Sequence, residues 1–124
     1  MVLEKSGVEA APPAAGIAVI ALGPDARDRI VPLVAELRRA SGDVPIVVDY
    51  HEGKIGAHFK RAERARARAA VILGDDELAQ DQIVVRDMLA RTQERLALDG
   101  RLADAILSWY AALPLAETAI REAV

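Results

Sequence analysis

The sequence contains no cysteine among its 124 residues, and aromatic residues make up only 3% of it. Without cysteine the chain can form neither a disulfide nor a thiolate metal site, and it has no cysteine nucleophile. Because aromatic rings are scarce, the interior must be filled mainly by Ala, Val, Leu and Ile. The composition therefore excludes a disulfide scaffold and predicts an aliphatic core.

Long apolar runs are also lacking. No stretch approaches the roughly 20 residues that span a bilayer, and residues 1–5 lack the charged-then-apolar order of a signal peptide. We therefore expect a cytoplasmic protein with no membrane partner. The formal net charge is only −3, which argues against a uniformly basic nucleic-acid binder, so the distribution of charge along the chain becomes the informative property.

What is present suffices for one folded domain. Hydrophobic residues make up 52% of the chain and charged residues 28%, in a length typical of a single domain. The Ala- and Pro-rich stretch that ends at Gly16 predicts an extended linker over residues 1–16. We therefore place the ordered domain at 17–113 and a C-terminal tail at 114–124, after Pro114.

Apolar runs alternate with helical patterns along the first part of this domain. Continuous apolar runs at 17–22, 46–48 and 70–73 predict three strands, the first of them central. Between them, apolar residues at helical spacing predict helices over 25–40 and 54–67. Since a strand, helix, strand order implies right-handed crossovers, we expect a parallel core of three strands.

The remaining residues complete the predicted sheet. Two short strands at 83–85 and 96–98 are close enough to pair as a hairpin-like extension, and 100–112 has the spacing of a last helix. The stretch from 73 to 87 is expected to be a polar loop leaving one strand and entering the next. Pro32 predicts a kink or a late start in the first helix. The expected fold is α/β: a mixed five-stranded sheet with a parallel core, flanked by three or more helices.

Positive charge is concentrated in the second predicted helix. Six of the sixteen Lys and Arg residues fall between Lys54 and Arg68, against one acid. A helical projection opposes a basic side to an apolar side, formed respectively by Lys54, Arg61, Arg64 and Arg68 and by Ile55, Phe59 and Ala62. Such a basic side can bind phosphates by displacing counterions. It is equally the ordinary condition of a solvated surface helix.

The start of that helix offers a second recognition element. Gly53 and Gly56 flank it, and the free N–H groups of a helix start favour a phosphate or another acceptor. The glycine spacing matches neither a dinucleotide-binding fingerprint nor a Walker loop. The loop therefore indicates no nucleotide cofactor.

Two charged residues stand out in the segment after the third predicted strand. Loops at the carboxyl ends of parallel strands are where α/β folds place ligands. There the Glu77 carboxylate can accept from base amino groups, and Arg86 can donate to base acceptors or to phosphate. The alternative is that Glu77 caps a local turn and Arg86 lies on a solvated edge strand.

Catalytic chemistry finds little support in the sequence. His51 and His58 are seven residues apart, and no HExxH or similar ligand spacing occurs. The serines, Ser6, Ser41 and Ser108, do not lie in a nucleophile elbow. We assign no catalytic and no metal-binding residue.

Taken together, these segments resemble the anticodon-binding domain shared by the class II aminoacyl-tRNA synthetases for histidine, threonine, proline and glycine. The motifs that match are Leu37-Arg38, Phe59-Lys60-Arg61-Ala62 and Leu73-Gly74-Asp75-Asp76-Glu77. Val84-Val85-Arg86-Asp87-Met88-Leu89 followed by Thr92-Gln93-Glu94 looks most like the histidine member. The resemblance covers about 17–113 and implies the three-layer fold of those domains.

The resemblance also implies roles for particular residues. In that family, the carboxylate that closes Leu-Gly-x-x-Glu and the basic residue nine positions later face the anticodon bases, which implies this role for Glu77 and Arg86. The loop and helix start at 52–56 line the same side. With the basic helix added, the expected RNA-binding residues are Glu52, Gly53, Lys54, Gly56, Lys60, Arg61, Arg64, Glu77 and Arg86.

The function implied by this resemblance is recognition of the anticodon stem-loop of tRNA(His). The parent enzyme attaches histidine to tRNA(His) using ATP and magnesium in a catalytic domain that this sequence lacks, so we expect no cofactor in this chain. Residues 1–16 are expected to include a remnant of that catalytic domain, and the parent is expected to be a homodimer that binds no DNA. The alternative is a stand-alone interaction or dimerisation module. Gly56-Ala57-His58, where the family has Lys-Lys-Gln, fits that alternative.

Overall fold

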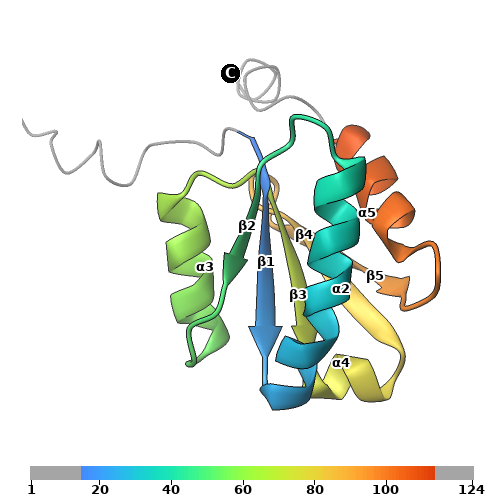
Figure 1. The fold of residues 1–124 in the computed structure, drawn as a ribbon. Helices are drawn as coiled ribbons and strands as arrows, with labels where there is room; N and C mark the ends of the chain where they lie inside the picture. Colours follow the sequence, from blue (N-terminus) through green and yellow to red (C-terminus); the bar gives the residue numbers. More distant parts are fainter. Residues whose placement is uncertain (1–14, 114–124) are drawn as a thin grey trace, which may run out of the picture.

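The computed structural model describes residues 15–113, in which strands and helices alternate before a final hairpin and helix (Figure 1). The elements are β1 (Ile17–Leu22), α2 (Pro24–Ala40), β2 (Ile46–Asp49), α3 (Ile55–Arg64), β3 (Ala69–Gly74), α4 (Asp75–Ala79), β4 (Gln82–Asp87), β5 (Thr92–Ala97) and α5 (Leu102–Ala111). Most of the predicted linker and the whole predicted tail lie outside the described residues. None of the helices in 15–113 combines the length and apolar composition that a membrane crossing needs.

The five strands form one sheet in the order β2-β1-β3-β4-β5. Strand β1 pairs in parallel with β2 and β3, whereas β4 is antiparallel to both β3 and β5. The predicted mixed sheet with a parallel core is therefore confirmed. Helices cover both faces of β1, so its first five residues are buried regardless of which face they point to, which explains why the run is continuously apolar.

Successive side chains of β1 point to opposite faces and enter two separate hydrophobic clusters. Ile17 and Val19 pack in the cluster that contains residues of α2 and α5. Ala18 and Ile20 pack in the second cluster, with Ala62 of α3. Figure 1 shows this layering, with α3 on one side of the sheet and α2 and α5 on the other.

The α3 side of the sheet is less fully covered than the α2 side. Val84 belongs to the α3-side cluster, so Gln82 and Arg86, two positions away on β4, point to the same face, as do their β5 neighbours Gln93 and Arg95. Gln93 and Arg95 are exposed, and Gln82 and Arg86 are half-buried. We call this surface of β4 and β5, formed by Gln82, Arg86, Gln93 and Arg95, the open sheet face.

A hydrogen bond joins the two ends of the described domain. The backbone N–H of Gly16, just before β1, donates to the Tyr110 hydroxyl near the end of α5, at 2.8 Å. Arg68 and Ala69 also donate backbone N–H groups to the Gly16 carbonyl. The start of β1 is therefore fixed to both α5 and β3.

Three features of the helices differ from those expected. Helix α2 starts at Pro24, where a proline loses no intrahelical bond, and it includes Pro32, so of the two effects predicted from Pro32 the late start was wrong. Helix α3 ends at Arg64 and not at 67, because Arg66 adopts the left-handed region, with φ 59°. The expected polar loop contains α4, whose acidic first turn suits the positive end of the helix dipole.

Two residues do not lie on the side of α3 that the helical projection predicted for them. Arg68, expected on the basic side, lies beyond the helix end and is buried in an ion pair with Asp87. Ile55, expected inside, is 37% exposed because it opens the helix at the edge of the sheet. The hairpin strands pair as predicted, although β5 occupies Thr92–Ala97 and so begins four residues earlier than expected.

Candidate functional site

Three segments meet at the carboxyl ends of the parallel strands. The β2–α3 loop, the β1–α2 turn and α4 follow β2, β1 and β3, and Figure 1 shows them at the same end of the sheet. An ion pair between Arg27 Nη2 and Glu52 Oε2, at 3.3 Å, joins the loop to α2. The Ala26 N–H donates to Asp75 Oδ1 at 3.0 Å and joins α2 to α4. We call these segments, residues 50–56, 23–27 and 74–79, the carboxyl edge.

Five of the nine predicted RNA-binding residues lie on this edge. Glu52, Gly53 and Lys54 are exposed in the loop, and Gly56 is exposed in the first turn of α3. Nothing lies within 4 Å of where a Cβ would stand at Gly53 or Gly56, so a ligand can approach their backbone. The backbone of the β2–α3 loop and of the first turn of α3 is therefore open to a ligand at Gly53 and Gly56, whereas the Ala57 and His58 N–H groups are bonded to the Lys54 carbonyl.

Glu77, the fifth of these residues, holds the start of its own helix. Its Oε1 atom accepts a hydrogen bond from the Gly74 N–H at 3.0 Å, and the side chain is half-buried. This is the local capping bond that the sequence left as an alternative. A carboxylate has about four acceptor positions, so Glu77 retains acceptor capacity for a ligand.

Arg86 lies on the open sheet face and is held by two neighbours. Its Cζ atom stands 4.8 Å from the centroid of the Phe59 ring, and its Nη1 atom donates to Gln93 Oε1 at 2.9 Å. Strand β4 is second from the edge, so Arg86 does not lie on a solvated edge strand. The guanidinium therefore lies over the Phe59 ring and is also held by a hydrogen bond to Gln93.

The register separates Arg86 from Glu77 along the sheet. Arg86 pairs with Ala70 near the start of β3, whereas Glu77 follows Gly74 at its end. Four residues of strand correspond to about 13 Å. The two residues that the resemblance assigns to anticodon bases thus belong to different parts of the surface, one to the carboxyl edge and one to the open sheet face.

The three remaining predicted residues lie along α3 and differ in availability. Lys60 and Arg64 are exposed. The Nε atom of Arg61 donates to Asp49 Oδ2 at 2.8 Å, and its side chain is 30% exposed. Lys60 and Arg64 are thus presented to solvent on this helix, whereas Arg61 is engaged by a carboxylate.

Asp49 accepts four hydrogen bonds beside the site, from the backbone and ring of His51, from His58 and from Arg61, and it was not among the residues predicted from the sequence. Burial raises the pKa of Asp49, but hydrogen bonds from Arg61, His51 and His58 outweigh that effect and hold the pKa well below its ordinary value. The four donors come from a loop and a helix that meet only in the fold, so no local motif marks the residue. Gln93 and Arg95 were missed as well, because β5 was expected to begin at 96. Gln93 and Arg95 are two residues apart, which is the spacing of side chains on one face of a strand, and this was the available signal.

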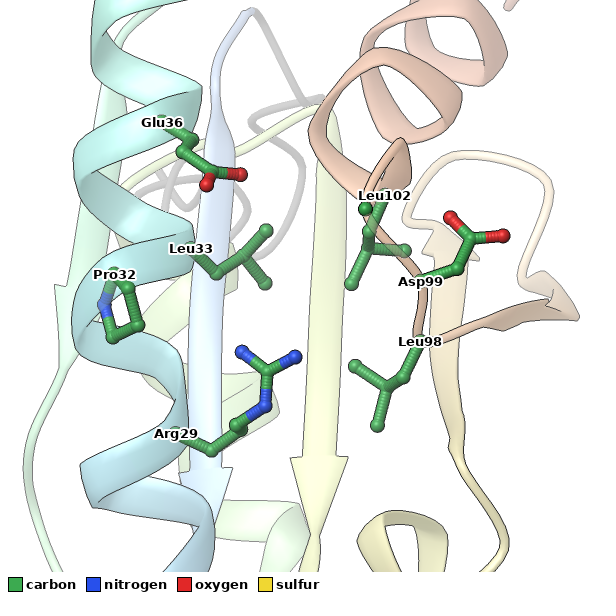
Figure 2. Close-up of a pocket in the computed structure, with 8 residues that line it drawn as sticks. Arg29, Pro32, Leu33, Glu36, Leu98, Asp99 and Leu102 are labelled. Atoms are coloured by element: carbon green, nitrogen blue, oxygen red, sulfur yellow. The ribbon is translucent and has the colours of Figure 1, made fainter.

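A separate groove lies on the opposite side of the sheet, between α2 and the segment leading into α5 (Figure 2). Its volume is about 340 Å³. Figure 2 shows Leu33 of α2 pointing toward Leu98 and Leu102 on the other wall, with Arg29 and Glu36 adding charges of opposite sign. None of the nine predicted residues lines it. The groove lacks the excess of positive charge that phosphate binding requires.

Comparison with known proteins identifies aminoacyl-tRNA synthetases among the relatives of this chain. The family model described as "Anticodon binding domain" matches residues 16–108. The histidine–tRNA ligase of Bacillus subtilis (strain 168) is 42% identical over 81 residues, which cover 65% of this chain and 19% of that ligase. The ligase of Bacillus velezensis is 41% identical over the same length and with the same coverage. The chain thus spans about a fifth of the length of these relatives.

Solved structures agree with this relationship. The apo S. aureus histidyl-tRNA synthetase superposes with a TM-score of 0.63 at 26% identity, over 79% of this chain and 27% of that one. The RNA-binding domain of threonyl-tRNA synthetase from Cryptosporidium parvum Iowa II superposes with a TM-score of 0.65 at 16% identity, over 91% and 27%, and so shares the fold. This chain therefore belongs to the anticodon-binding domain family and is an anticodon-binding domain homologous to those of histidyl-tRNA synthetases.

Proposed function

We propose that this domain recognises the anticodon stem-loop of tRNA(His), using the open sheet face together with α3 and the carboxyl edge. The stacking of Arg86 on Phe59 is the single observation that supports this most. Anticodon bases are unstacked in their loop, and proteins read such bases by stacking and by hydrogen bonds to their edges. Phe59 occupies one face of the guanidinium, so a base can stack on the other face.

Phosphate binding is assigned to the cations near Arg86 and Phe59. Lys60 and Arg64 are exposed on α3, and Lys54 precedes its first turn, beside the positive end of the helix dipole. Neutralising phosphates releases counterions and supplies affinity without sequence preference. The net charge of −3 does not oppose this role, because these cations are concentrated on one helix.

Base reading is assigned to Arg86 and Glu77. A guanidinium donates to base acceptors, and a carboxylate accepts from base amino groups. Glu52, Gly53, Gly56 and the partly engaged Arg61 complete the proposed surface. Because the two reading residues stand apart on the sheet, we assign them to different nucleotides of the loop.

The attachment of histidine to tRNA(His) is proposed for the full-length enzyme that contains such a domain. In that protein, a catalytic domain attaches histidine to tRNA(His) using ATP and magnesium, and this domain carries no cofactor. We propose a cytoplasmic homodimer as the working form, in which the anticodon-binding domain contributes tRNA selection. A stand-alone interaction module is not favoured, because the family match covers most of the chain.

Binding measurements with the full 124-residue chain test the proposal. A synthetic tRNA(His) anticodon stem-loop and the same stem with a scrambled loop serve as ligands, at fixed and stated salt. Arg86→Ala is expected to weaken binding to the tRNA(His) loop by about 1–3 kcal/mol and to reduce discrimination between the loops. Glu77→Gln keeps an oxygen for the Gly74 N–H while removing the charge, and it is expected to reduce discrimination as well.

Arg29→Ala is the matched control, because Arg29 lies on α2 at the groove of Figure 2, on the opposite side of the sheet. It removes the same charge and is expected to leave discrimination unchanged. Equal affinity of the wild-type chain for both loops would contradict anticodon recognition. Absence of binding to either loop would instead support an interaction module.

A further inference from the structure

Asp49, the last residue of β2, has a side chain that is only 10% exposed, and its carboxylate accepts four hydrogen bonds. Its Oδ1 atom accepts from the backbone N–H of His51 at 3.0 Å and from His51 Nδ1 at 2.9 Å. Its Oδ2 atom accepts from His58 Nδ1 and from Arg61 Nε, both at 2.8 Å. One oxygen therefore holds the loop, and the other holds α3.

Within residues 15–113, few other contacts fix that loop. Tyr50 is 61% exposed, and Glu52 and Gly53 are also exposed. Gly53 has a φ of 139°, a backbone conformation that residues other than glycine rarely adopt. The ion pair between Arg27 and Glu52 involves a Glu52 side chain that is 81% exposed, and such surface pairs contribute little. The shape of the β2–α3 loop thus depends mainly on the hydrogen bonds of Asp49.

The α3 side of the cluster is anchored in the interior. His58 is fully buried, and Arg61 lies one turn later on the same side of the helix. Asp49 stays ionised to well below neutral pH, because its donors outweigh the effect of burial. In Asp49→Asn one carboxylate oxygen becomes an NH2 group, so either the donors of the loop or those of buried His58 and half-buried Arg61 lose their acceptor, which is costly.

We propose that Asp49 is a positioning residue for RNA recognition, holding the β2–α3 loop against α3 so that Glu52, Gly53 and Lys54 face the nucleic acid. The inference rests on the proposed function, which assigns those loop residues to the RNA surface. Asp49 makes no contact with RNA in this scheme. It acts through the loop and through Arg61.

The sign of the effect separates this role from simple electrostatics. A carboxylate beside a polyanion repels it, so removal of a bystander charge strengthens RNA binding. A positioning carboxylate gives the opposite result, because its loss releases the loop. Loss of a direct phosphate contact also lowers the dependence of binding on salt by about one unit of slope, whereas loss of a positioning group does not.

The test compares Asp49→Asn with the wild-type chain, using the same synthetic anticodon stem-loop over a range of salt concentrations. The expected result is about tenfold weaker binding with an unchanged salt slope. Lys54→Ala provides the contrast, with weaker binding and a shallower slope. Asp43→Asn is the matched control: it removes the same charge from the exposed turn before β2, and binding should stay equal or become slightly tighter.

Hydrogen exchange measures the positioning directly. In Asp49→Asn, the His51 amide should exchange faster while amides of β1 and β3 keep their protection. His51→Ala, at a side chain that is 69% exposed, removes one link without disturbing the interior and should weaken binding in the same direction. Wild-type-like or tighter binding by folded Asp49→Asn overturns the inference. Failure of the wild-type chain to prefer its stem-loop overturns the proposed function instead.

Discussion

At the residue scale, Arg86 shows how the fold prepares a flexible side chain for recognition. A free arginine loses rotamer entropy when it binds a ligand. Here the Phe59 ring and the Gln93 amide already restrict the guanidinium. Arg86 itself could be proposed from its position in the sequence, but Phe59 and Gln93 could not, because one comes from α3 and the other from β5.

Substitution of Phe59 measures the contribution of the ring. Phe59→Leu keeps an apolar side chain in the α3-side cluster, so the cost in stability should stay below about 1.5 kcal/mol. Loss of the stacking partner is expected to weaken binding to the anticodon stem-loop by about two- to fivefold. Phe59→Tyr keeps the ring and should bind like the wild-type chain. Equal affinities of the Leu and Tyr variants, measured by titration, would rule out a role for the ring.

At the element scale, the end of α3 shows why helix boundaries were harder to predict than strands. The Ala67 N–H donates to the Ala62 carbonyl, and the Arg66 N–H donates to the Glu63 carbonyl. With Arg66 in the left-handed region, this is a Schellman ending. Such endings usually carry glycine, so the arginine gave no warning. The apolar run of β1, by contrast, is dictated by burial on both faces and was readily predicted.

The conformation of Arg66 can be tested with two variants. Arg66→Gly and Arg66→Ala both remove the side chain, so any interaction it makes is lost equally. Only glycine adopts the left-handed region without a Cβ penalty, so the Gly variant should be more stable than the Ala variant by about 1 kcal/mol. Chemical denaturation of the two proteins measures the difference. A more stable Ala variant would show that the helix continues past Arg64.

Helix α4 illustrates a second limit of the sequence at this scale. Its five residues show no apolar periodicity, and the sequence suggested only a polar loop. Its formation depends on the Glu77 bond to Gly74 and on Asp75, which caps the start of α2. The bond between Glu77 and Gly74 is local and was an alternative open from the sequence, whereas the bond between Asp75 and Ala26 joins residues 49 apart and could not be predicted from local patterns.

At the scale of the whole molecule, the sheet and its layers followed from the sequence, whereas the shape of the candidate site did not. The strand order and both helical layers depend on apolar patterns that are strong in this chain. The site depends on which polar side chains meet across strands and loops. Lys60 and Arg64 are exposed as predicted, but Arg61 and Arg68 are engaged by Asp49 and Asp87.

The same two carboxylates predict how stability depends on pH. Burial raises the pKa of Asp87, but hydrogen bonds from Ala90, Arg68 and Leu89 outweigh it and hold the pKa below its ordinary value of 3.8. The pKa of Asp49 is lowered in the same way. A pKa that is lower in the folded state stabilises the fold above the unfolded value, and this stabilisation is lost as the pH falls below it.

The free energy of unfolding should therefore decrease as the pH falls below about 4. Asp49→Asn should show a weaker decrease, because one of the two groups no longer titrates. Denaturant unfolding at a series of pH values measures both curves. The same pH dependence in the variant and the wild-type chain would exclude a contribution from Asp49.

The hydrogen bond between Gly16 and Tyr110 places the two ends of the described domain at one end of the sheet. It brings the entry and the exit of the described chain together at the amino end of β1, and the carboxyl edge lies at the other pole. A fusion partner, a surface tether or a neighbouring domain joined at either point would start from the pole that is farthest from Lys54 and Glu77. An attachment at Gly16 or just after α5 would therefore leave the carboxyl edge accessible to a large ligand.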